Sequence, residues 1–106
     1  MGGFRANLTM RPKTATGMQG PLTVNTSPVF IPSTWPQPGD SSVLISNNGG
    51  DVLMGIGTDP TTGPKGVRIP ANTSYLIENN PGDIVKARFV RITASDGLLS
   101  FQFFTE

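Results

Sequence analysis

The fold class is decided by residues 43–56, which read Val43-Leu-Ile-Ser-Asn-Asn-Gly-Gly-Asp-Val-Leu-Met-Gly-Ile56. Two apolar runs of strand length, Val43–Ile45 and Val52–Ile56, flank the turn residues Asn47–Gly50. Aliphatic and β-branched residues in runs of this length favour strands, and Asn and Gly supply the positive φ angles of a tight turn. The stretch therefore predicts two strands, which we expect to pair as an antiparallel hairpin.

The same alternation of short apolar runs and turn residues continues to the C-terminus. We expect strands at 67–69, 74–78, 84–94 and 98–104, the third with a β-bulge near Val90 and Arg91. Ser95-Asp96-Gly97 predicts a second hairpin, leading into the last strand. In that strand Leu99, Phe101 and Phe103 alternate with polar residues, so these three side chains should face the core.

These patterns predict an all-β protein, because no stretch carries the 3.6-residue apolar period of a useful helix. Short strands at this spacing suit a small antiparallel β-sandwich or barrel, of the jelly-roll or immunoglobulin-like kind. We assign residues 41–106 to this domain. The chain of 106 residues contains no Cys, so no disulfide reinforces the fold.

Residues 1–40 differ in composition, and we expect them to form an extended N-terminal arm. Prolines break any helix and forbid a central strand throughout the arm, at positions 12, 21, 28, 32, 36 and 38. Its β-favouring pieces, 22–24 and 29–31, should lie as edge strands on this domain or on a neighbour.

The arm also holds the residues that we expect to bind a partner protein, namely Val29, Phe30, Ile31 and Trp35. The first three would pair against a strand edge, and the indole would fill a pocket on the neighbour. The alternative for Trp35 is that it caps the core of its own domain.

Composition and charge argue against several classes of function. The net charge of +1 provides no field to hold a phosphate backbone, so nucleic acid is not an expected partner. No apolar run approaches the roughly 18 residues that span a membrane, and the N-terminus lacks the apolar core of a signal peptide, so we expect synthesis in the cytoplasm.

Without His or Cys, the commonest general base and the best zinc ligands are missing. We therefore expect no enzyme activity, no cofactor, and no catalytic or metal-binding residues.

A resemblance is carried by four segments: Val43–Asn47, Val52–Gly57, Gly66–Asn72 and Ile84–Arg88. An Asn-ended strand, a strand ending in Gly, a polar loop, an apolar strand before a Pro/Ala turn and an Ile-x-x-Ala strand follow one another in this order. Over residues 42–104 the chain resembles small β-rich virion structural proteins of tailed bacteriophages, of the head decoration or cement type, the head-fibre type or the head-tail accessory type. The first forty residues carry no part of this resemblance.

The resemblance implies a capsid decoration or cement protein that stabilises the head by binding capsomer junctions. Its partners would be the major capsid protein or other virion proteins, and its location the virion after synthesis in the host cytoplasm. Such proteins are commonly symmetric homo-oligomers, and a trimer would match threefold positions. The alternatives are a head-tail connector or tail accessory protein, or a carbohydrate- or receptor-binding fibre module.

Overall fold

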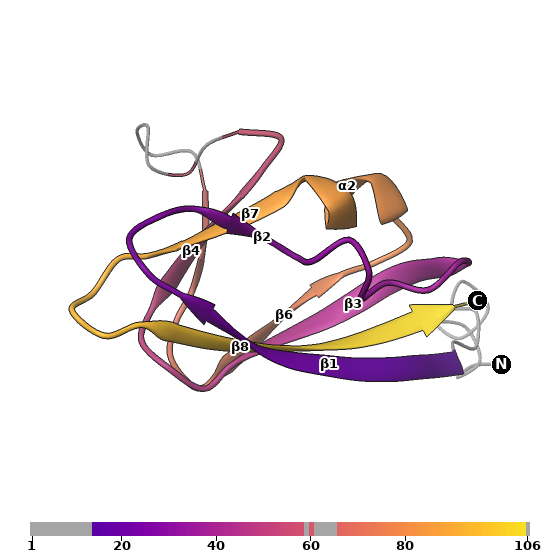
Figure 1. The fold of residues 1–106 in the computed structure, drawn as a ribbon, viewed down its shortest axis with the longest axis horizontal. Helices are drawn as coiled ribbons and strands as arrows, with labels where there is room; N and C mark the ends of the chain where they lie inside the picture. Colours follow the sequence, from indigo (N-terminus) through magenta and orange to yellow (C-terminus); the bar gives the residue numbers. More distant parts are fainter. Residues whose placement is uncertain (1–13, 59, 61–65, 106) are drawn as a thin grey trace, which may run out of the picture.

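The computed structural model describes residues 14–58, 60 and 66–105, and in them eight strands form two four-stranded antiparallel sheets. The first sheet contains β1 (Thr14–Val24), β8 (Gly97–Thr105), β3 (Asp40–Asn47) and β6 (Thr73–Ile77), in that order. The second contains β2 (Val29–Phe30), β7 (Ala87–Arg91), β4 (Val52–Ile56) and β5 (Val67–Ile69). One short helix, α2 (Pro81–Lys86), precedes β7 (Figure 1).

The topology is that of a jelly roll. β1 pairs with β8, β2 with β7, β3 with β6 and β4 with β5, so the first half of the chain runs antiparallel to the second half throughout. This long double strand is folded over on itself, which brings β8 beside β3 and β7 beside β4. Eight strands in two sheets with this order define a jelly roll, whereas an immunoglobulin-like sandwich has a different strand order. The predicted β-sandwich is confirmed.

The core lies between the two sheets and is built around three Phe rings. Phe89 comes from the second sheet, and Phe101 and Phe103 come from the first. The Phe101 ring lies 5.9 Å from the Phe89 ring, edge to face, and 6.3 Å from the Phe103 ring. Leu99, Phe101 and Phe103 are all buried, as the alternation in the last strand predicted.

The part of the expected arm that the structure describes, residues 14–40, belongs to the sandwich. β1 pairs with β8 from Thr14 to Val24, and β2 pairs with β7. Both are edge strands of their sheets, as expected for 22–24 and 29–31, and Val24 is fully buried in the core. The remaining part of the arm, residues 1–13, lies outside the described residues.

Neither expected hairpin forms, because both turns connect strands in different sheets. β3 and β4 do not pair, and neither do β7 and β8. Asn47 explains the first connection: its buried Nδ2 donates to Gly50 O (2.8 Å) and to Ile69 O (3.0 Å), while its Oδ1 accepts from Gly49 N (2.9 Å). These bonds turn the chain from one sheet to the other.

The two glycines after Asn48 serve close packing rather than positive φ angles. A Cβ on Gly49 would lie 2.6 Å from Asp96 O, and one on Gly50 would lie 2.4 Å from Ser95 O. The two inter-sheet connections therefore pack backbone to backbone, and only glycine leaves room for this contact.

The strand expected over residues 84–94 is also corrected. Its first part is helix α2, and the strand itself covers only Ala87–Arg91. Asn80 caps the helix by accepting from Asp83 N through its side chain, and Pro81 follows at the start of the helix, where a missing N–H costs nothing. The pairing of β7 with β4 runs in continuous register, so the expected bulge at Val90 and Arg91 is absent from it.

Candidate binding site

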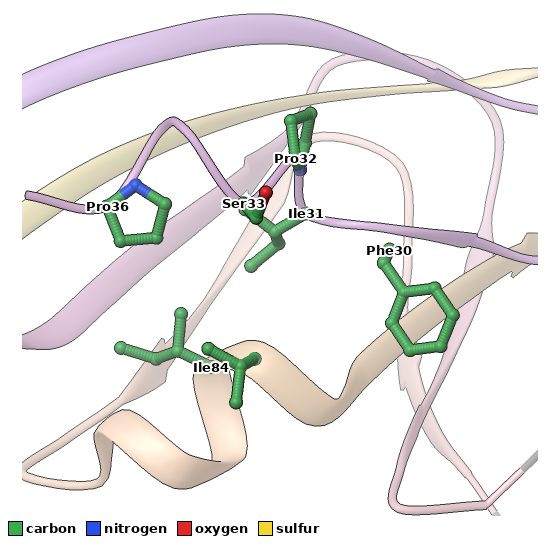
Figure 2. Close-up of a pocket in the computed structure, with 7 residues that line it drawn as sticks. Phe30, Ile31, Pro32, Ser33, Pro36 and Ile84 are labelled. Carbon is green, nitrogen blue, oxygen red and sulfur yellow. The ribbon is translucent and has the colours of Figure 1, made fainter.

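An open apolar pocket of about 340 Å³ lies between α2 and the segment that follows β2. Figure 2 shows the residues after β2 on one side and Ile84 of the helix on the other. Seven residues line the pocket, and all but one are apolar: Phe30, Ile31, Pro32, Ser33, Pro36, Ile84 and Val85. This size is at the lower end of the range for small-molecule pockets, and it also suits one large apolar side chain.

Proline and local hydrogen bonds shape the wall that follows β2. Pro28 and Pro32 flank the strand, which is why it is only two residues long. The chain then turns, with Trp35 N donating to Pro32 O (3.0 Å). A second bond closes the segment, as Gln37 N donates to a carboxylate oxygen of Asp40 (2.7 Å).

Helix α2 provides the other wall through two adjacent residues with different environments. Ile84 is buried, and it anchors the helix to the core between the sheets. Val85 points away from the core and is 64% exposed. A partner that covers an aliphatic side chain this exposed is bound more tightly, because burial of apolar surface stabilises the complex by roughly 25 cal/mol per Å².

Phe30 is the aromatic residue of the pocket, and it is 46% exposed. The guanidinium carbon of Arg88, its partner in the adjacent strand, lies 5.0 Å from the centre of the ring. A cation at this distance is attracted to the ring face and helps to hold the ring in place. Phe30 is thus a fixed, half-exposed apolar surface.

The structure separates the four residues expected to bind a partner. Val29 and Trp35 pack against the core, and Ile31 is buried while also lining the pocket. Phe30 faces the pocket. For Trp35 the structure shows the alternative, since its ring lies 5.8 Å from that of Phe101 and caps the domain's own core.

Two pocket residues, Ile84 and Val85, were missed because residues 84–94 were expected to form a strand. The signal that could have revealed them is the sequence Asn80-Pro81-Gly82-Asp83, a helix cap with proline at the first helical position.

None of the residues that line the pocket is charged, and Arg88 lies against it only through the Phe30 ring. Asp51, which does not line the pocket, accepts from Ala71 N (2.9 Å) and forms an ion pair with Arg68. The hydrogen bond from Ala71 N, followed by that from Arg68, lowers the pKa of Asp51 below its ordinary value of 3.8.

The described residues hold no candidate metal site and no membrane-spanning helix. In the described ranges, no three His, Cys, Asp or Glu side chains come together as a possible metal site. Helix α2 has six residues. No helix in the described part of the chain is long and apolar enough to cross a membrane.

Comparisons with protein-family models, with curated proteins and with solved structures found no match to this chain.

Proposed function

We propose that this chain is a structural virion protein of a tailed bacteriophage, a decoration protein that binds junctions between capsomers on the head. The observation that supports the proposal most directly is the open apolar pocket between Phe30 and Val85. A pocket of this kind suits capture of an apolar side chain from another protein.

The fold supports the same proposal by analogy. Jelly rolls of eight strands recur in viral capsid domains and in lectins. One fold hosts many functions, so the jelly roll supports a viral structural role by analogy and does not by itself establish that role. The resemblance of residues 42–104 to virion proteins agrees with it.

Attachment would depend on side-chain burial more than on strand addition. Only Val29 and Phe30 form β2, and prolines on both sides limit main-chain pairing to this short edge. Filling the pocket with one Leu or Phe side chain contributes about 1.5–3 kcal/mol. A single contact is therefore weak, and stable decoration requires several contacts per copy.

The fibre-module alternative has less support, because Trp35 and Tyr75, the two residues that could serve as aromatic platforms for a sugar, both pack against the core. Trp35 packs on Phe101, and Tyr75 is partly buried against the core. A sugar-binding face needs aromatic rings that are free to stack.

The test uses virions of the phage that encodes this chain, prepared from a mutant that lacks the gene. Purified protein is added at increasing concentration, and bound copies per particle are counted by quantitative gel electrophoresis. We expect saturable binding, and about a tenfold weaker affinity for Val85→Lys, which corresponds to about 1.4 kcal/mol. Ile92→Lys is the matched control, because Ile92 is also an exposed aliphatic residue but lies outside the pocket.

Three outcomes are informative. Failure of the wild-type protein to bind particles would contradict the virion role. Equal binding of Val85→Lys and the wild type would exclude the pocket as the contact. Electron microscopy of the decorated particles then separates copies spread over the head from a ring at the neck, which would indicate a connector instead.

A further inference from the structure

The first sheet has an unusual distribution of charge. Its four strands, β1, β8, β3 and β6, contain a single Asp, Glu, Lys or Arg, which is Asp40. Asp40 is buried at the start of β3, and its carboxylate accepts from the Thr16 hydroxyl (2.7 Å) and from Gln37 N (2.7 Å). The outer face of this sheet therefore presents no charged side chain from its strands. In the second sheet, by contrast, β5 and β7 carry Arg68, Arg88 and Arg91.

Strand register shows which side chains form this outer face. Val43 and Ile45 are fully buried, so Leu44 between them points outward. Leu44 pairs with Gln102 on one side and with Leu76 on the other, and Gln102 pairs with Met18. Met18, Gln102, Leu44 and Leu76 thus form one row across all four strands.

This row is apolar at both edges of the sheet. Met18 is 66% exposed and Leu76 is 45% exposed. In the middle, Gln102 Nε2 already donates to Gly17 O (3.0 Å) and to Phe103 O (3.2 Å). The amide nitrogen therefore keeps its hydrogen bonds when another surface covers it. The next outward row is Ser100, Ser46 and Ser74, in which the last two hydroxyls lie 3.2 Å apart and bond to each other.

We infer that the outer face of the sheet β1-β8-β3-β6 is a contact surface for a second copy of this chain. The inference does not depend on the proposed virion role.

Charge explains why a second copy fits this face. Charged groups on a partner surface would lose their hydration on this face without gaining an opposite charge. Burying them here would therefore cost binding free energy. The partner surface must therefore be uncharged as well, and depletion of charge is typical of the centre of protein interfaces. The chain's own face meets this requirement and is present at the same concentration.

Symmetry makes the pairing self-consistent. Two copies that pack face to face around a two-fold axis parallel to the strands place Met18 of one copy against Leu76 of the other, and the reverse contact is identical. Sheets that pack in this way lie about 10 Å apart, with their outer side chains between them.

The area indicates a weak association. Four strands about 4.8 Å apart, with paired segments of five to eight residues at about 3.3 Å per residue, cover roughly 400 Å². Two such faces bury about 800 Å² in total, which is below the roughly 1,200 Å² of a stable interface. We therefore expect a weak and reversible dimer, as is typical of interfaces of this size.

Sedimentation velocity of the full chain from about 5 to 500 μM tests the inference. The wild-type sedimentation coefficient should rise with concentration from that of a monomer towards that of a dimer. Met18→Lys and Leu76→Lys, which each place a charge on the face, should stay monomeric over the same range. Ile92→Lys should dimerise like the wild type, because Ile92 is 43% exposed, nearly as much as Leu76, but lies in the connection after β7.

Circular dichroism shows whether each variant is folded. If Leu76→Lys does not fold, Met18→Lys is sufficient for the test, because Met18 is the more exposed of the two residues. A wild-type chain that remains monomeric at 500 μM overturns the inference. So does a Met18→Lys or Leu76→Lys chain that associates as strongly as the wild type, or a complex of three copies, since face-to-face packing closes after two.

Discussion

The indole ring of Trp35 lies against the phenyl ring of Phe101, with the ring centroids 5.8 Å apart and the planes tilted by 55°. This contact joins the proline-rich segment to the last strand of the chain. Through it Trp35 covers the core of its own domain, and Phe30 is the aromatic residue of this segment that lines the pocket.

Trp35→Ala should destabilise the isolated protein. Replacing a fully buried large aromatic residue by Ala lowers the free energy of unfolding by about 3–5 kcal/mol. Because Trp35 is only partly buried, we expect a loss of about 2 kcal/mol. Urea unfolding followed by circular dichroism measures this, since the variant has no Trp for fluorescence. Phe30→Ala is the comparison and should cost less than about 1 kcal/mol. A Trp35→Ala protein as stable as the wild type would show that the contact with Phe101 contributes nothing.

Phe101→Ala should cost about 3–5 kcal/mol, because its fully buried ring contacts those of Trp35, Phe89 and Phe103. Phe104→Ala is the matched control, because this neighbouring Phe is only partly buried and lies on the outer face. The midpoint of urea unfolding gives both values. Equal losses for the two variants would contradict the assignment of inner and outer faces in β8.

Asn47→Asp should cost about 3 kcal/mol or more at neutral pH. The carboxylate cannot donate to Gly50 O or Ile69 O, and it places a negative charge beside two carbonyl oxygens in a buried position. Asn48→Asp, at the exposed next residue, should change stability by less than about 0.5 kcal/mol. Thermal unfolding at pH 7 compares the two, and similar melting temperatures would argue against a structural role for the Asn47 amide.

The contacts of Asp51 should make stability fall in acid. Its pKa is lower in the folded chain than in the unfolded chain, mainly because Ala71 N donates to it, so the unfolded chain binds more protons as the pH falls. The contribution is fully present above the unfolded-state pKa near 3.8 and is lost as the pH falls through the folded-state value. Asp51→Asn should therefore show a smaller drop in melting temperature than the wild type between about pH 5 and pH 2. Identical drops would mean that Asp51 has no part in the acid sensitivity.

Truncation distinguishes a detachable arm from a strand of the fold. A chain that begins at Pro21 lacks the pairing of Thr14 to Gln19 with Phe101 to Thr105, and it leaves that part of β8 unpaired on one side. It should be less stable than a chain that begins at Thr14. Hydrogen exchange measured by mass spectrometry should show faster exchange in residues 101–105. Unchanged exchange there would mean that β1 adds little to the sheet.

The sequence alone determined the fold class and most strand positions, because apolar runs of strand length and turn residues are local signals. The alternation Leu99, Phe101, Phe103 identified the buried side of β8, and the partly buried, short β2 follows from Pro28 and Pro32. Phe30 was predicted to bind a partner on a different basis, because residues 29–31 favour a strand that could pair with a partner's edge. That assignment remains a prediction, although the structure places the ring in a pocket.

Only the tertiary structure decided which strands pair. Asn47–Gly50 and Ser95–Gly97 mark turns in the sequence, but a turn residue does not specify whether the chain returns in the same sheet or crosses to the other. Here the crossing is fixed by the long-range hydrogen bond from Asn47 Nδ2 to Ile69 O and by the close approach of Gly50 to Ser95. The pocket and the uncharged outer face depend on the same long-range pairing, because they join residues far apart in the sequence, such as Phe30 with Val85 and Met18 with Gln102.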